Sequence, residues 1–301
     1  MIQNNMLNFK KLNLEESHKI ISLLKNQDYK TCDYTFCTTY MYRNYFSTEY
    51  AIFDDTVIFK VNLADGRQMY TIPVGKKKLK ESIAILENIC LENGTDLDLC
   101  MVPSSAYFYL KKRYGGNLKE YTNRDFYDYL YFSQDIINLK GKRYHGQRNH
   151  INRFLSNHPD YEFVLINSDN IMQIRNFYLS YISIYIPDGK FAEVEKNAVF
   201  DVLDNFDMLD LFGAFIKADG KIISFSIGEI QNDTLFVHIE KAYHDVPGAY
   251  QITVNQFAKT FGADITYINR EDDAGIEGLR KSKLSYHPTS LLEKYSVHIT
   301  L

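Results

Sequence analysis

The sequence is poor in glycine and proline, with 15 and 6 among its 301 residues. Hydrophobic residues make up 45% and charged residues 24%, a balance that excludes disordered, collagen-like and low-complexity chains. No apolar run approaches the roughly 20 residues that a membrane-spanning helix needs, and the polar start of the chain has no apolar core of a secretory signal. We therefore expect a soluble protein of the cytoplasm without a transmembrane segment.

Cysteines are few, and tryptophan is absent. The four cysteines show neither CxxC spacing nor flanking histidine pairs, which argues against zinc, and we expect reduced thiols and no bound metal. The chain also lacks GxSxG, GxxxxGKS, HExxH and a complete GxGxxG, so serine hydrolases, P-loop nucleotidases and zincins are poor candidates. The 24 tyrosines and 20 phenylalanines favour bulky cores over a platform for stacked bases.

The order of elements predicted for the first half recurs in the second. A strand, a helix, a strand and a second helix are predicted over residues 69–74, 76–94, 96–103 and 104–116, and again over residues 234–241, 248–262, 264–271 and 275–286. A glycine ends the first helix of each series, Gly94 and Gly262. The predicted fold class is α/β (α+β), with two units that are each a mixed twisted sheet flanked by helices. We place the N-terminal domain at residues 1–135 and the C-terminal domain at residues 136–301.

The two halves differ where chemistry would need them to. At its turn the first half has Val74, Gly75 and three lysines, without a strand-end carboxylate such as Glu240. We predict a degenerate first unit and a second unit that carries the candidate site; the alternative is that both units are structural.

Glu240 is the candidate catalytic carboxylate. Strand alternation predicts that His238 and Glu240 lie on one face of their strand and reach one pocket together. A desolvated carboxylate there would orient an incoming amine or take its proton. The alternative is a buried glutamate paired with Arg270 or Lys283, and His238 alone is more often a core histidine.

A helix start after this strand offers a seat for phosphate. Backbone N–H groups of a first helical turn converge with the positive end of the helix dipole. The residues concerned are Gly248, Ala249, Tyr250 and Gln251.

Polar residues also follow the next apolar strand, where ligands usually bind in α/β sheets. Asn269 and Arg270 are candidate substrate contacts there. Three acids follow them. An ordinary acidic helix start explains these acids as well as a magnesium site does, and we expect no metal there.

Basic residues of the last predicted helix are candidates for holding a donor. Arg280 and Lys283 share one helix face at a spacing of three residues, and Lys281 lies beside them. Tyr286 is a candidate hydrogen-bond donor or general acid towards a leaving oxygen. The alternative is a solvated basic helix end.

One segment is densely basic although the formal net charge is −4 and neither half is basic overall. Its candidate contacts to phosphate or RNA are Lys142, Arg143 and Arg148. The alternative, which the sequence alone favours, is a hydrated start of an amphipathic helix.

The motifs GKRYHGQRNHINRF, FSIGE, VHIEKA, PGAYQ, INRED and GLRKSKLSYHP resemble, in this order, an uncharacterised bacterial family related to the C-terminal domain of phosphatidylglycerol lysyltransferase. The resemblance covers nearly the whole chain and implies two tandem GNAT-like units. Lys281 and Lys283 match the lysines of the family's Lys-x-Lys-aromatic-x-Pro motif, and Pro288 its proline. Tyr286 stands one residue later than the family's aromatic. The turn at Gly248 keeps the middle glycine of the acetyl-CoA signature and lacks the rest.

The function that this resemblance implies is an enzyme of the acyltransferase type. It would transfer an acyl or aminoacyl group, from acyl-CoA or aminoacyl-tRNA as donor substrate, to an amine or hydroxyl acceptor by direct attack. The acceptor would be a small molecule, a lipid headgroup or a peptide, and tRNA is a partner if it is the donor. Two alternatives are an ordinary acyl-CoA N-acyltransferase and a non-catalytic module that binds nucleotide, RNA or peptide in an interdomain groove.

Overall fold

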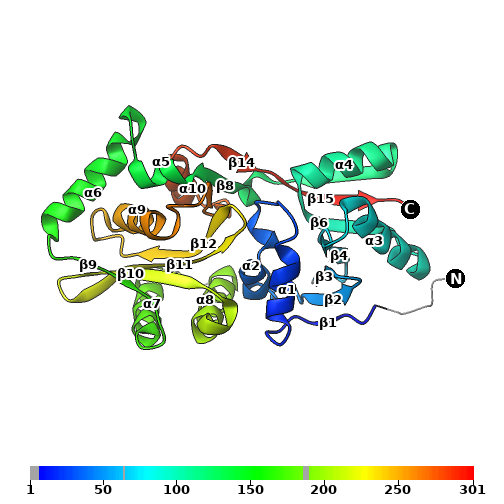
Figure 1. Cartoon of the computed structure of the whole chain (residues 1–301), viewed down its shortest axis with the longest axis horizontal. Coiled ribbons are helices and arrows are strands. Elements are labelled where there is room, and N and C mark those ends of the chain that lie inside the picture. Colours follow the sequence, from blue (N-terminus) through cyan, green and yellow to red (C-terminus); the bar gives the residue numbers. More distant parts are fainter. Residues whose placement is uncertain (1–6, 64, 186–189) are drawn as a thin grey trace. The chain divides into compact units, whose positions relative to one another are not determined.

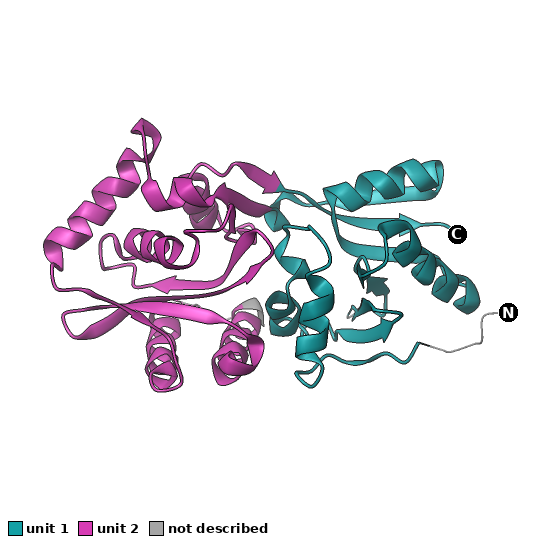
Figure 2. Ribbon diagram, in the orientation of Figure 1, with its two compact units in different colours: residues 1–127, 292–301 teal, residues 128–291 magenta. Residues whose placement is uncertain are grey.

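The computed structural model describes residues 7–63, 65–185 and 190–301, which form two compact units (Figure 2). The first contains residues 1–127 and 292–301, and the second contains residues 128–291. Each unit is a mixed sheet flanked by helices, so the predicted fold class is confirmed. No helix in the described ranges has the length and apolar character needed to cross a membrane.

The sheet of the first unit has the strand order β1-β2-β3-β4-β6-β15-β7, and β5 pairs with β3. Its strands are β1 Lys10–Lys11, β2 Glu49–Phe53, β3 Thr56–Asn62, β4 Gln68–Tyr70, β5 Val74–Gly75, β6 Leu97–Pro103, β7 Leu118–Thr122 and β15 Lys294–Ile299. Its helices are α1 Ser17–Leu24, α2 Phe36–Met41, α3 Leu79–Asn93 and α4 Ser104–Tyr114. Gly94 ends α3 with φ +64°, as the predicted helix stop requires.

The sheet of the second unit has the order β14-β8-β13-β12-β11-β10-β9. Its strands are β8 Asp128–Phe132, β9 Glu162–Leu165, β10 Phe212–Ala218, β11 Lys221–Gln231, β12 Thr234–Ala242, β13 Tyr267–Asn269 and β14 Ser290–Leu292. Its helices are α5 Ser133–Asn138, α6 His145–Asn157, α7 Ile171–Tyr185, α8 Lys190–Asp204, α9 Ala249–Phe261 and α10 Glu277–Leu284. The predicted sequence of strand, glycine turn, helix, strand and basic helix is therefore confirmed for residues 234–286.

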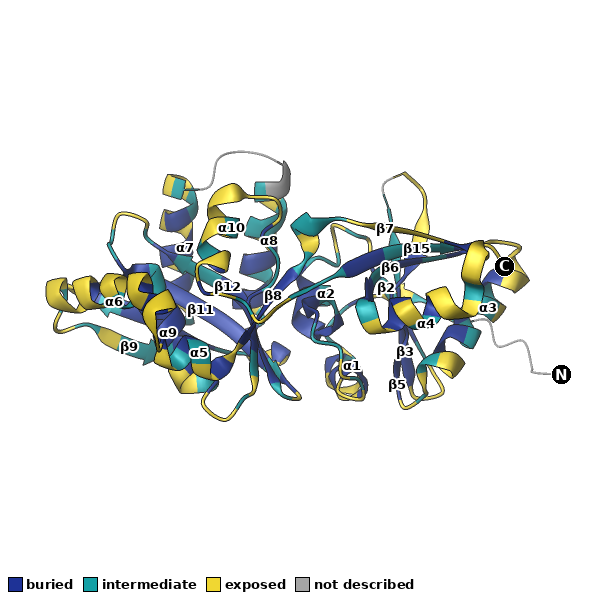
Figure 3. Cartoon of the chain, turned by 90° about the horizontal axis from the view of Figure 1, so that it is seen from above, coloured by how far each residue is buried: buried dark blue, intermediate teal, exposed yellow. Residues whose placement is uncertain are grey.

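Helices cover both faces of this second sheet (Figure 1). On one face α9 packs Val254 and Phe257 against Leu235 and Val237 of β12. On the other face Phe177 of α7 makes an edge-to-face contact with Phe225 of β11. Strands β11 and β12 are consequently buried along most of their length (Figure 3), as expected for strands with helices on both sides.

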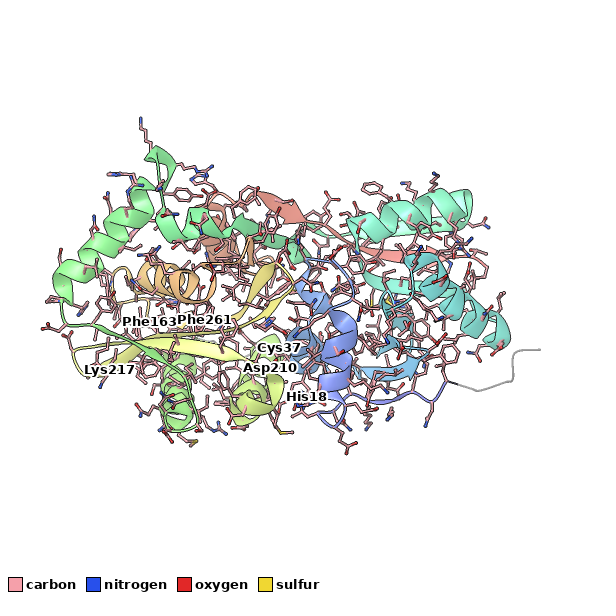
Figure 4. The ribbon with its side chains drawn as sticks, in the orientation of Figure 1. His18, Cys37, Phe163, Asp210, Lys217 and Phe261 are labelled. Carbon is pink, nitrogen blue, oxygen red and sulfur yellow. The ribbon has the colours of Figure 1, made fainter. Side chains whose placement is uncertain are left out.

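The core beneath α9 extends to the end of the helix and to an edge strand. Phe163 of β9 and Phe261 of α9, both labelled in Figure 4, pack against it while remaining partly exposed. This apolar layer anchors α9, and it therefore fixes the position of the strand-to-helix turn that precedes α9.

The two compact units differ from the predicted ranges in two places. Residues 128–132 form β8, which pairs with β13 and so belongs to the second sheet. Residues 294–299 form β15, which pairs with β6 and β7 of the first sheet and buries Val297 and Ile299 there. The reason is pairing across long sequence separations, which local periodicity does not reveal.

Candidate functional site

Strands β12 and β13 run together for only three residues and then separate. They pair in parallel over Thr234–Phe236 and Tyr267–Asn269, while β12 continues along β11 to Ala242. Beyond the shared stretch, Arg270 Nη2 donates to Glu240 Oε1 at 2.6 Å. Both side chains are largely buried, with exposed fractions of 6% and 14%. The pairing of Glu240 with Arg270, one of the two interpretations drawn from the sequence, is thus present.

A β-bulge separates His238 from Glu240. The pairing of β12 with β11 skips His238, because Val237 and Ile239 face consecutive residues of β11. Glu240 therefore lines the same cavity beneath α9 as Val237, whereas His238 lies on the face of Phe236, whose ring is nearly parallel to its own at 6.4 Å. The prediction that His238 and Glu240 share a face is wrong, because a bulge interrupts strict strand alternation.

The cavity beside Glu240 and Arg270 is small and mostly apolar. It has a volume of about 10 Å³, the room of one water molecule. Its remaining lining is aliphatic or aromatic: Ile136, Leu235, Val237, Val254, Phe257, Ala258 and Ile268. In this dry setting the ion pair interacts more strongly than it would in water.

Three buried polar atoms near this ion pair have no hydrogen-bond partner in the described ranges: Arg270 Nη1, Tyr286 Oη and Ser226 Oγ. The guanidinium carbon of Arg270 lies 4.9 Å from the ring centre of Tyr286, and Ser226 is the cross-strand neighbour of Glu240. Buried polar groups in proteins are nearly always satisfied, so such a group indicates a bound water or ligand. Burial raises the pKa of the Tyr286 hydroxyl, which keeps its proton at neutral pH.

The loop after β13 is held by the basic residues of α10. Lys283 is buried, and its ammonium donates to the backbone carbonyls of Arg270 and Asp272. Arg280 donates to Asp273 through Nε at 2.9 Å and Nη2 at 2.6 Å. These two predicted donor contacts therefore position the loop that carries Arg270. Burial, followed by the charge of Arg270, lowers the pKa of Lys283.

Other residues of this region divide into buried and exposed ones. Asn269 is buried and its amide donates to Asp128 Oδ2 at 2.9 Å. Lys281 is exposed and pairs with Glu277 at 2.6 Å. Of the predicted basic contacts on α10, Lys281 is the one whose ammonium faces solvent.

His238 belongs to a buried charged triad. Its Nδ1 lies 2.8 Å from Glu271 Oε1 and its Nε2 lies 2.9 Å from Glu229 Oε1. Burial alone would lower the pKa of His238, but the hydrogen bonds to Glu229 and Glu271 raise it to about 9. His238 is therefore an imidazolium at neutral pH, and it ties the loop after β13 to β11.

The turn before α9 has the predicted conformation but little room. Gly248 has φ +86° and caps α9. A Cβ at this position would lie 2.3 Å from the carbonyl oxygen of His150 and 2.9 Å from Cβ of Phe154, both in α6. Ala249 is fully buried, and Tyr250 lies 3.3 Å from Tyr181 through their hydroxyls. Helix α6 thus occupies one side of the predicted phosphate seat.

The basic segment forms a short 3-10 turn followed by α6. Arg148 donates to the backbone carbonyls of Leu139 and Gly141, and Arg143 donates to Asp135 at 2.9 Å. Lys142 is exposed. The two arginines therefore stabilise the connection between α5 and α6. Of the three predicted phosphate or RNA contacts, Lys142 is the one for which the described residues show no such contact.

Sequence reasoning missed Ser226 and Glu229. Both lie in the FSIGE motif of β11, which we used only as part of the family resemblance. A carboxylate within an otherwise apolar strand was the signal available, since buried charges are almost always paired.

Comparison with known proteins gives the family. The family model described as phosphatidylglycerol lysyltransferase, C-terminal, matches residues 25–298. A solved conserved protein of unknown function from Bacteroides thetaiotaomicron is 33% identical, with a TM-score of 0.91 over 98% of this chain and 100% of that one. The structure of L-PGS from Bacillus licheniformis is 13% identical, with a TM-score of 0.60 over 84% of this chain and 83% of that one.

A curated relative, an uncharacterized protein of Mycoplasmoides gallisepticum, is 25% identical over 174 residues. The match covers 57% of this chain and spans 56% of the length of that relative. The match of the family model confirms the resemblance drawn from the sequence motifs. The chain belongs to the family of the C-terminal domain of phosphatidylglycerol lysyltransferase.

Proposed function

We propose that the second unit transfers an aminoacyl group from aminoacyl-tRNA to an amine or hydroxyl acceptor by direct attack. The observation that carries this proposal is the set of unsatisfied polar atoms around the Glu240–Arg270 pair. Besides the three buried atoms, Glu240 has a second carboxylate oxygen, Oε2, beside the Oε1 that accepts from Arg270. The site thus offers an acceptor oxygen, a guanidinium donor and a hydroxyl to a polar ligand.

The three groups match the needs of acyl transfer. The acceptor N–H or O–H attacks the ester carbonyl carbon, and Glu240 takes its proton. Arg270 Nη1 donates to the oxygen that becomes negatively charged in the tetrahedral intermediate. The ester C–O bond then breaks, and the leaving ribose oxygen takes the proton of Tyr286, which solvent or the carboxylic acid of Glu240 restores. Only a new amide or ester and the uncharged tRNA are released.

The cavity in this structure has room for about one water molecule. Because a substrate needs more room than this, we propose that its binding widens the opening between β12 and β13. Within the described residues, strand pairing between β12 and β13 ends at Phe236 and Asn269, which supports this step because no further strand pairing must break.

The packing at Gly248 favours an aminoacyl ester over a CoA thioester as donor. A CoA diphosphate needs close backbone approach at the start of the helix. Here helix α6 fills the side of Gly248 on which even a methyl group does not fit. We assign donor contact instead to the solvent-facing Lys281 and Lys142, which would neutralise tRNA phosphates.

The test supplies lysyl-tRNA as donor and phosphatidylglycerol vesicles as acceptor probe, as the family description suggests. The rate of label transfer is measured with wild-type protein and with Glu240→Gln, Arg270→Met and Tyr286→Phe. Loss of a catalytic proton acceptor or oxyanion donor lowers kcat by about 10²–10⁴.

Tyr178→Phe is the matched control. Tyr178 is also fully buried, with a hydroxyl that has no partner among the described residues, but it packs on the opposite face of the sheet against Phe225. Its removal leaves transfer unchanged if the site is correct. Turnover of acetyl-CoA without use of lysyl-tRNA would refute the donor, and full activity of Glu240→Gln would refute the mechanism.

A further inference from the structure

The first unit has a large cavity of its own. It has a volume of about 610 Å³, within the range of about 300–1,000 Å³ typical of sites for small ligands. Its walls come from the segment after α1, the turn between β5 and α3, and the first turns of α3 and α4. The lining includes Tyr29, Lys76, Lys77, Lys78, Ser82 and Ser105.

The wall of this cavity is cationic. It carries Lys76, Lys77 and Lys78, opposed by the single carboxylate of Asp28. Lys76 pairs with Asp55 at 2.8 Å and Lys77 with Asp54 at 2.5 Å, in ion pairs at the surface. Such exposed pairs contribute little to stability, so an anionic ligand competes with them at small cost.

Two helices begin at the cavity. Helix α3 starts directly after Lys78, and α4 starts at Ser104, so that Ser105 of its first turn lies in the wall. The positive ends of both helix dipoles therefore act on the same space. Helix starts of this kind bind phosphate through backbone N–H groups.

A buried serine points to a ligand independently of the helix starts. Ser82 is 1% exposed and lines the cavity. Its Oγ has no hydrogen-bond partner in the described ranges, although a serine in a helix usually bonds to a carbonyl one turn earlier. An unpartnered buried hydroxyl at a cavity wall is explained by a polar group bound in that cavity.

We propose that this cavity of the first unit binds the diphosphate of a nucleotide. Lys78 and Ser82 contact its phosphate oxygens together with the first turn of α3. Tyr29, whose ring packs edge-to-face against Tyr34 at 4.8 Å, gives the wall an aromatic side chain for the base. All of its lining residues belong to the first unit, so it adds a binding function to that unit whatever reaction the second performs.

The test measures binding of ADP, inorganic pyrophosphate and uncharged tRNA by calorimetry at 50 and 200 mM salt, on the full chain. Ser82→Ala and Lys78→Gln each weaken binding roughly tenfold or more, the loss expected for a hydrogen bond to a charged group. Tyr29→Leu weakens ADP but not pyrophosphate.

Lys80→Gln is the matched control, because Lys80 is exposed on the same helix and does not line the cavity. Its binding constants stay at wild-type values. Glu240→Gln also leaves binding unchanged, which separates this proposal from failure of the reaction proposed above. Thermal unfolding of each variant shows that the fold is kept, since Ser82→Ala removes only an unpartnered hydroxyl.

The outcomes distinguish the source of the phosphate. Binding of ADP and pyrophosphate that is sensitive to Ser82 and Lys78 identifies a free nucleotide. Binding of tRNA alone with the same sensitivity would overturn the diphosphate as the ligand and assign the site to the phosphates of an RNA end. The proposal is overturned if none of the three probes binds, if Lys80→Gln weakens binding as much as Lys78→Gln, or if Ser82→Ala has no effect.

Discussion

The ion pair between Glu240 and Arg270 gives a stability prediction that is independent of any substrate. Glu240→Leu leaves the guanidinium of Arg270, 6% exposed, without its carboxylate in an apolar pocket. Removing one partner of a buried pair costs about 3–5 kcal/mol of unfolding free energy. For a unit of this size, 1 kcal/mol shifts Tm by about 2–4 °C, so the melting of the second unit falls by roughly 6–20 °C.

The double variant Glu240→Leu/Arg270→Met tests the cause of that loss. Replacing a whole buried pair by apolar groups is often neutral or stabilising, so we expect the double variant to recover most of the stability that either single variant loses. The assay is a double-mutant cycle by urea unfolding followed by circular dichroism. The cycle gives the coupling energy between Glu240 and Arg270, which is compared with that of an exposed ion pair.

The exposed pair of Lys281 and Glu277 is the control for this cycle, because its side chains are 75% and 79% exposed. Its coupling is about 0.5 kcal/mol or less. A cost below about 1 kcal/mol for Glu240→Leu, or equal coupling in the two cycles, would show that water reaches Arg270 and that the site is not dry.

Three further predictions concern single residues. The stability that protonated His238 supplies is complete below its unfolded pKa of about 6.5 and is lost as pH rises through its folded pKa of about 9. The urea midpoint of the wild type should therefore fall between pH 6 and 9.5, and His238→Gln should abolish this fall. An unchanged fall in the variant would assign the pH dependence to another group. Gly248→Ala should cost at least about 2 kcal/mol in urea unfolding, through its φ of +86° and its contact with α6; a stable variant would mean that α6 moves away easily. Tyr286→Phe should raise the unfolding free energy by up to about 1 kcal/mol while it slows transfer, whereas a loss of stability would reveal a partner for its hydroxyl.

The local order of elements was predictable from sequence, and pairing across the chain was not. The glycines at 94 and 248 marked a helix end and a helix start correctly, because backbone conformation at such positions depends on the residue itself. The assignment of β15 to the first sheet depends on its pairing with β6, almost two hundred residues away. Hydrophobic periodicity in the sequence does not indicate this pairing.

In the candidate site, too, some features were predictable from the sequence and others were not. Glu240 and Arg270 were both selected, and their pairing was one of the two interpretations. The bulge at His238 was not predicted, because a single extra residue in a strand leaves the apolar pattern nearly intact while it reverses the face of everything after it. Lys283 was interpreted as a donor contact, as a partner of Glu240 or as part of a solvated helix end, whereas in the structure its ammonium donates to backbone carbonyls of the loop after β13.

Strand β15 imposes an order of assembly on the chain. It lies between β6 and β7 in the first sheet, yet its residues, 294–299, are synthesised after the whole of the second unit, 128–291. Until these residues join the sheet, β6 and β7 lie unjoined and their edges are exposed to other chains. Of the two units, the one that begins earlier in the sequence is therefore the one whose sheet is completed last.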